Sequence, residues 1–198
     1  RNEKYGHMEY TFYGSGMEHA TMSSMGYFGQ EIIAHELLHQ WFGDKITCGK
    51  WNDIWLNEGF ATFGQHFVNE KFILTHDQFL NYLLNQKNYI TSLPNGSVYV
   101  ADANLNSDTA IFDGRLSYAK AGYVVRMLKW ILGEDAFYSA IRDYASRPNL
   151  AYSYAVTSDL QNSLLQSTGI DFSEFFNDSI YGEGYPIYAI QWNQVGSS

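Results

Sequence analysis

Apolar residues along most of the chain recur at steps of three and four positions, which is the spacing of one face of an α-helix. The first such run begins at about Gln30, and Gly43 is its predicted end. Its apolar members are Ile32, Ile33, Leu37, Leu38 and Trp41. Thr75 is a suitable N-cap for a later helix, and Gly133 ends another. The same spacing predicts further helices over residues 56–72, 76–89, 116–132, 135–146, 158–168 and 172–181.

The N-terminal part of the chain follows a different pattern. Residues 5–27 are rich in Tyr, Phe, Thr, Met and Gly, and they predict short β-strands broken at Gly14 and Gly16. No linker composition divides the chain into two parts. We therefore expect one domain of the α+β class that is predominantly α-helical, with a β-strand region over 1–29 and a helical region over 30–190.

Two stretches inside the helical region lack the helical spacing. Residues 44–53 predict a loop or a short strand, and residues 91–114 predict a long irregular connection. Loops of the second length are usually functional or disordered. Cys48, in the first stretch, is the only cysteine, so the chain can form neither an internal disulfide nor a thiolate zinc cluster. We expect Cys48 to be a small buried apolar residue.

Composition and charge narrow the classes of function. The formal net charge of the 198 residues is -9, which argues against a nucleic-acid partner because phosphate binding needs clustered Lys and Arg. No apolar run reaches the roughly 18–20 residues of a membrane span. The chain begins at Arg1 and ends in the polar run NQVGSS, so we interpret it as a fragment of a longer protein and leave its compartment open.

The run HELLHQWFGD, residues 35–44, predicts a metal site. Side chains four positions apart on an α-helix are rotated by only ~40° and separated by one turn of ~5.4 Å. His35 and His39 therefore point to the same side, and both imidazoles can reach one zinc ion. Two histidines packed among ordinary neighbours are the alternative, because the short motif alone is weak. Glu58, in WLNEGFA after eighteen intervening residues, supplies a third ligand and favours one zinc ion per chain.

Three stretches together resemble the aminopeptidase N family of zinc metallopeptidases, which are gluzincins. HELLHQWFGD and WNDIWLNEGFAT fit the family pattern of H-E-x-x-H, eighteen residues and Glu. GSGMEH is similar to the family's G-x-M-E-N: Gly16, Met17 and Glu18 match, and His19 replaces Asn. SYAKAGYVVRML resembles the family's Tyr-x-Lys-Gly stretch through Tyr118, and the segment FFNDSIYGEGYPIYAI resembles the end of the catalytic domain.

The resemblance implies a thermolysin-like catalytic domain over residues 1–198, cut from a protein with flanking domains. It also implies a zinc aminopeptidase that takes peptides with a free N-terminus. Zinc supplies a nucleophile at neutral pH, and Glu36 is the expected general base. Tyr118 is the expected donor to the oxyanion. Gly16, Met17 and Glu18 are the expected substrate-binding residues, with the Glu18 carboxylate paired to the substrate α-ammonium.

Several alternatives stay open at this point. The chain also fits a thermolysin-type endopeptidase, or a zinc-bearing peptide-binding module without turnover. Zinc-bound histidines usually donate their second N–H to a carboxylate or carbonyl. Gln65 stands where such a carboxylate is expected, two turns after Glu58, and Glu70 and Asp44 are other possible partners. His7, His66 and His76 show no ligand spacing, so we assign them no functional role. Side-chain preference and oligomeric state are not predicted.

Overall fold

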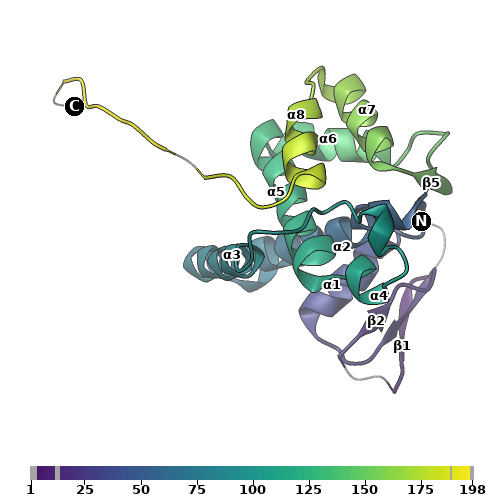
Figure 1. Cartoon of the computed structure of the whole chain (residues 1–198). Helices are drawn as coiled ribbons and strands as arrows, with labels where there is room; N and C mark the ends of the chain where they lie inside the picture. The colour runs from purple at the N-terminus through teal and green to yellow at the C-terminus, as the bar shows by residue number, and fades with distance from the viewer. Residues whose placement is uncertain (1–3, 12–13, 188, 197–198) are drawn as a thin grey trace.

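Helices make up most of the chain and start where local chemistry favours them. The computed structural model describes residues 4–11, 14–187 and 189–196 (Figure 1). The helices are α1 (Gln30–His39), α2 (Trp55–Val68), α3 (His76–Ile90), α4 (Asp108–Ile111), α5 (Ala121–Leu132), α6 (Glu134–Tyr144), α7 (Thr157–Thr168) and α8 (Ser173–Phe176). Short 3₁₀ or π-helical segments are η1 (Trp51–Asp53), η2 (Asn69–Ile73), η3 (Asp102–Asn104), η4 (Gly114–Lys120) and η5 (Asn177–Tyr181). The prediction of a mainly helical α+β chain is confirmed.

Capping residues explain several boundaries. Thr75 forms a capping box with Gln78: the Thr75 hydroxyl accepts from the Gln78 N–H at 3.4 Å, and the Gln78 amide oxygen accepts from the Thr75 N–H at 2.9 Å. Asp113 caps η4 and starts that helical segment earlier than the predicted residue 116, because its carboxylate accepts the N–H groups of Arg115 and Leu116. The predicted end of α1 at Gly43 is wrong, because the helix ends at His39 and a tight turn follows.

Two small sheets complete the fold. β1 (Gly6–Glu9), β3 (Met22–Met25) and β2 (Gly16–Met17) form the first in that order, with β1 parallel and β2 antiparallel to β3. The predicted break at Gly16 is wrong, because Gly16 pairs with Met25 inside β2. A Cβ atom on Gly16 would lie 2.2 Å from the Glu36 carboxylate, so the strand needs glycine to pass this close to α1.

The second sheet joins two distant parts of the chain. β4 (Ile46–Cys48) pairs in parallel with β5 (Ser153–Ala155), which the sequence did not predict. β4 lies in the stretch 44–53, for which a loop or a short strand was predicted, and β5 lies between the predicted helices 135–146 and 158–168. The pairing ties the C-terminal helices to the loop that follows α1.

α2 is the central helix of the core and packs against both α1 and α5. Gly64 lets α1 and α2 approach closely, because a Cβ atom there would lie 2.6 Å from the Leu38 side chain. The largest fully buried side chains include Trp55, Phe60, Phe137, Tyr144 and Phe176. The close contact of α1 with α2 fixes the relative positions of the predicted ligands.

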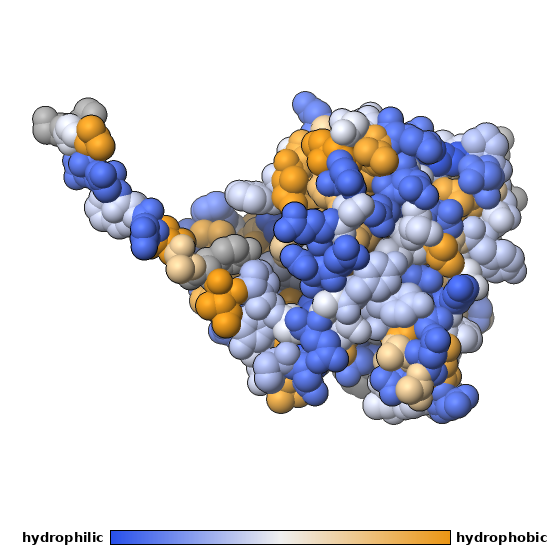
Figure 2. Space-filling view, turned by 45° about the horizontal axis from the view of Figure 1, so that its top comes forward, coloured by the Kyte–Doolittle hydropathy of each residue, from blue (hydrophilic) through white to orange (hydrophobic). Residues whose placement is uncertain are grey.

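The C-terminal segment extends away from the helices (Figure 1) and carries no helix or strand over 182–187 and 189–196. Several of its apolar side chains are exposed (Figure 2): Ile187, Ile190, Trp192 and Val195. No helix within the described ranges has the length and apolarity that crossing a membrane requires.

Candidate active site

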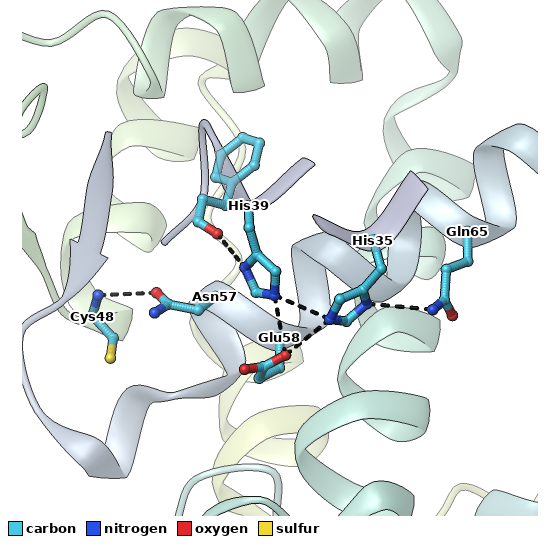
Figure 3. Close-up of polar contacts among 7 residues, drawn as sticks. His35, His39, Cys48, Asn57, Glu58 and Gln65 are labelled. Atoms are coloured by element: carbon cyan, nitrogen blue, oxygen red, sulfur yellow. Dashed lines mark hydrogen bonds and ion pairs between the residues drawn. The ribbon is translucent and has the colours of Figure 1, made fainter. Parts of the chain in front are cut away.

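α1 and α2 bring three ligand-type side chains to one point (Figure 3). His35 and His39 come from adjacent turns of α1, and their Nε2 atoms lie 3.0 Å apart. Glu58, in the first turn of α2, places its Oε2 atom 3.2 Å from His35 Nε2 and 3.3 Å from His39 Nε2. All three side chains are buried. Two imidazole nitrogens and a carboxylate oxygen around one point are a donor set that fits zinc.

The electrostatics of this cluster favour positive charge at its centre. Burial alone would raise the pKa of Glu58, but hydrogen bonds from His35 and His39 lower it to about 2. Glu58 is therefore a carboxylate at neutral pH. Burial opposes the charged form of His39, but the hydrogen bond and the charge of Glu58 raise its pKa to about 9. Burial lowers the pKa of His35. The centre thus attracts a proton or a metal cation.

Glu36 lies beside the cluster without joining it. Its side chain is buried, and its Oε2 atom has no hydrogen-bond partner within the described part of the chain. Burial raises the pKa of Glu36 to about 7. A buried carboxyl group with a pKa near neutrality, facing a cavity, is suited to accept and return a proton.

The same cavity collects the other predicted residues. It has a volume of about 830 Å³ and is lined by Gly16, Met17, Glu18 and Tyr118 as well as by the three ligands and Glu36. Carboxylate oxygens of Glu18 and Glu36 and a ring nitrogen of His39 all lie within 4.8 Å of one another. The structure thus brings together all eight residues that the sequence suggested for the site.

Tyr118 lies in η4 and lines the same cavity. Its ring stacks on the His35 imidazole, with centroids 6.0 Å apart and an angle of 17° between the planes. Burial and the nearby carboxylates raise the pKa of Tyr118 well above its usual value. The hydroxyl therefore keeps its proton at neutral pH and is available as a hydrogen-bond donor.

The two histidines have different partners at Nδ1. His39 Nδ1 lies 2.9 Å from the backbone oxygen of Phe42, and His35 Nδ1 lies 3.4 Å from the Gln65 amide (Figure 3). Glu70, an alternative partner suggested by the sequence, instead pairs with Arg126 at 2.9 Å and is not part of the site. The Phe42 contact left no sequence signal, because any residue has a carbonyl there.

Gln40 is a supporting residue that the sequence reading missed. Its amide oxygen accepts from the Thr21 N–H at 2.8 Å, and its amide nitrogen donates to the Glu18 carbonyl at 3.2 Å. These bonds attach the strand region to the end of α1. The sequence offered only a polar residue directly after the second histidine of HELLHQ, and its burial is visible only in the structure.

Two further residues that the sequence singled out, His19 and Cys48, lie outside the ligand set. His19, which replaces the family's Asn, has its Nδ1 atom 2.9 Å from the Ser24 hydroxyl, a local structural contact. The expectation that Cys48 is buried is wrong: it is half-buried and lines the cavity. Its N–H donates to Asn57 at 3.0 Å (Figure 3). Burial raises the pKa of the Cys48 thiol to about 11, so it stays protonated at neutral pH.

A family model and several relatives match most of this chain. Residues 17–179 match the family model described as Peptidase family M1 domain. The leucyl aminopeptidase of Saccharolobus solfataricus is 34% identical over 166 residues, which is 81% of this chain and 20% of that protein. The puromycin-sensitive aminopeptidase of Caenorhabditis elegans is 35% identical over 173 residues, 84% of this chain and 18% of that protein. The chain thus spans about a fifth of the length of these relatives.

A solved structure shows the same fold. It is an M1 zinc metallopeptidase variant from Deinococcus radiodurans bound to a Tyr-Ser-Ala substrate. The two chains superpose with a TM-score of 0.76 at 22% sequence identity, over 92% of this chain and 40% of that one.

Proposed function

The chain belongs to peptidase family M1, and from this premise we propose that it is the thermolysin-like catalytic part of a zinc-dependent aminopeptidase. The observation that carries the proposal is the buried cluster of His35, His39 and Glu58 beside Glu36, whose Oε2 atom has no hydrogen-bond partner among the described residues. Its substrates would be peptides with a free N-terminus, and further domains of a longer protein would complete the cleft. The proposed catalytic domain is residues 1–198.

One zinc ion per chain would be held by His35, His39 and Glu58, whose donor atoms already converge. When bound, zinc supplies a Lewis acid that polarises the scissile carbonyl and makes water a nucleophile at neutral pH. Both imidazoles must bind as neutral groups and Glu58 as a carboxylate. The low pKa of Glu58 meets the second requirement.

Glu36 performs the proton transfers. Its buried carboxylate takes a proton from the attacking water and passes it to the leaving amine. Because burial raises its pKa to about 7, the group can do both near neutral pH. Tyr118 keeps its hydroxyl proton and donates a hydrogen bond to the oxyanion that develops on the substrate carbonyl.

Glu18 and β2 select and align the substrate. The Glu18 carboxylate lies next to Glu36 in the cavity, where it can pair with the α-ammonium group of the first residue. A peptide without that charge would leave Glu18 unpaired, which disfavours internal peptide bonds. Gly16 and Met17 form an edge strand that lines the cavity, so an extended substrate can add to its backbone.

The test is a panel of aminoacyl chromogenic substrates and the matching N-acetylated peptides, with metal content measured on the same sample. We expect about one zinc per chain and cleavage of free-amine substrates only. Equal cleavage of acetylated peptides would favour a thermolysin-type endopeptidase. Zinc without turnover, in both this chain and a longer parent chain, would favour a peptide-binding module.

A further inference from the structure

Asn57 lies in the cavity wall one position before Glu58, in the first turn of α2. Its side chain is buried, and its Oδ1 atom accepts from the backbone N–H of Cys48 at 3.0 Å (Figure 3). A backbone N–H can only donate, so this bond fixes the orientation of the amide, with its oxygen toward Cys48 and its NH₂ group turned away. The opposite orientation would place two donors against each other.

The NH₂ group of Asn57 remains as a donor. Among the described residues it makes no hydrogen bond, and its nitrogen is not one of the fully buried polar atoms that lack a partner. The nitrogen is therefore accessible from the cavity that Asn57 lines. The bond to Cys48 accounts for the amide oxygen and leaves the donor without a use inside the described fold.

The cavity around this donor is rich in acceptors. The side chains of Glu18, Glu36 and Glu58 line it together with Asn57. An extended peptide carries one carbonyl per residue, and pairing with the edge of β2 satisfies only the carbonyls that face β2. The other oxygen atoms of a bound peptide need donors elsewhere in the cavity, because ionised carboxylates can only accept.

We infer that Asn57 is a further substrate-binding residue whose NH₂ group donates a hydrogen bond to an oxygen atom of the bound peptide. This inference rests on the proposed function. The oxygen is either a backbone carbonyl beyond the cleaved bond or part of the first residue's side chain, and both are acceptors of the same chemistry. Because one helical turn carries both Asn57 and Glu58, the bond holds the peptide in a fixed position relative to the proposed zinc ligands.

The experiment compares two replacements of Asn57. Asn57→Asp keeps an oxygen for the Cys48 N–H and replaces the donor by a second acceptor, whereas Asn57→Leu has a similar shape and loses both. Asn104→Asp is the matched control, because it makes the same chemical change at an exposed residue of η3 outside the cavity lining. Zinc content and melting temperature are measured for every variant.

Three substrates distinguish the two sources of the oxygen. Alanyl anilide has no acceptor beyond the cleaved bond, trialanine adds backbone carbonyls there, and glutaminyl anilide adds an oxygen to the first side chain. The value of kcat/KM is measured for each with the zinc-loaded chain. The affinity for trialanine is also measured by calorimetry on the zinc-free chain, so that this readout does not depend on turnover.

We expect Asn57→Asp to lower kcat/KM by about 10–100-fold for the substrate that carries the recognised oxygen, since two acceptors then face each other. Alanyl anilide should be nearly unaffected. A loss with trialanine, together with weaker trialanine binding, identifies a backbone carbonyl, and a loss with glutaminyl anilide identifies a side-chain oxygen. Asn57→Leu should show the same selectivity, and Asn104→Asp should match the wild type.

An equal loss on all three substrates would overturn the inference, because it indicates that Asn57 acts only through its structural bond to Cys48. No loss on any substrate in Asn57→Asp would also overturn it, even if Asn57→Leu is impaired, because only the second variant removes the acceptor. If the wild type cleaves none of the substrates, the proposed function fails. Unchanged trialanine binding in Asn57→Asp would then refute the role of Asn57 separately.

Discussion

Gln65 and His66 are consecutive residues of α2 that face different surroundings, because each step along the helix rotates the side chain by about 100°. They show two ways in which the fold accommodates a polar group. Gln65 lines the cavity and reaches His35. His66 is fully buried against the ring edges of Tyr82 and Tyr123. Within the described residues, neither ring nitrogen of His66 has a hydrogen-bond partner.

The two surroundings show that one helix carries polar groups that serve the proposed chemistry and a polar group that affects only stability. A buried polar group costs free energy unless it is hydrogen-bonded. On the cavity side, Glu58 and Gln65 each meet a histidine nitrogen, so their burial is compensated and serves the proposed chemistry. Burial and the nearby Arg126 cation lower the pKa of His66 to about 3. The fold therefore keeps that imidazole neutral without a partner.

Replacing Glu58 by Gln should have the largest effect on the cavity side. The variant keeps the shape of the side chain but removes the charge that favours a cation between His35 and His39. We expect zinc affinity to fall by more than the roughly 10–100-fold that loss of an outer partner costs. Turnover should fall by at least about 10³-fold, because the metal supplies several kcal/mol.

Metal analysis and kcat measurements check this prediction, and circular dichroism should show an intact fold. Treatment of the wild type with a chelator should reproduce the loss of turnover, and added zinc should restore it only in the wild type. Full zinc content in Glu58→Gln would remove this residue from the ligand set.

Replacing Tyr118 by Phe should have the next largest effect, with zinc retained. The change removes one hydroxyl and keeps the ring that stacks on His35. Loss of one oxyanion donor typically lowers kcat by about 10²–10³-fold, with little change in KM. Zinc content, melting temperature and kcat are measured on one preparation. A normal kcat with a lower melting temperature would assign the hydroxyl a structural role instead.

Replacing Glu18 by Gln should have a smaller effect that appears mainly in substrate binding. The loss of one partner of a buried charge pair costs roughly 2–5 kcal/mol, and the low end applies because the Glu18 carboxylate is only half-buried. We therefore expect kcat/KM to fall by about 30-fold. The Gln40 bond to the Glu18 carbonyl is a backbone contact, so the strand should keep its place. An equal loss for free-amine and N-acetylated substrates would contradict pairing with the α-ammonium.

Local spacing explains what the sequence could predict. His35 and His39 lie four positions apart on a helix, so their shared direction follows from helix geometry alone. The N-cap at Thr75 is likewise local and was predicted. Glu58 was assigned as the third ligand from its position at the start of the next helical segment, whereas only motif resemblance placed Tyr118 near the histidines. The helices that position them were predicted to within a few residues.

Non-local contacts explain what the sequence could not predict. β5 has only three residues and is stabilised by pairing with β4, which lies 107 positions earlier in the chain (Ile46 pairs with Ser153). Such a short strand shows too little alternation of apolar and polar residues to be predicted from the sequence. Cys48 lies at the end of β4, where the cavity exposes it on one side, and no local rule indicates that. The sequence offered Gln65 as one of three possible partners of the ligand histidines and left the choice open. The contact with His35 depends on the close packing of α1 on α2 that Gly64 permits.

Replacing His66 by Phe should have the smallest effect, confined to stability at acidic pH. The folded-state pKa of His66, about 3, lies below its ordinary value of 6.5, so the unfolded chain binds more protons between these values. The free energy of unfolding therefore falls as pH falls from about 6.5 to about 3, by at most about 1.4 kcal/mol per pH unit from this group. Phe cannot take up a proton, so the variant should lose this slope while zinc content and kcat stay normal.

Denaturant unfolding between pH 7 and pH 5 checks this prediction. This pH range lies above the range in which Glu70, a salt-bridged carboxylate whose pKa is lowered, changes the free energy of unfolding. His76→Gln is the matched control, because it removes a histidine that is exposed in the first turn of α3. His66→Leu guards against overpacking by the Phe ring, and the two variants should agree in slope even if they differ in stability at pH 7. If both variants keep the wild-type slope, some other group sets the acid sensitivity. His66, which has no hydrogen-bond partner within the described residues, would then contribute little to the pH dependence of the free energy of unfolding. The contrast between His66 and the cavity-lining residues of α2 would rest on hydrogen bonding alone.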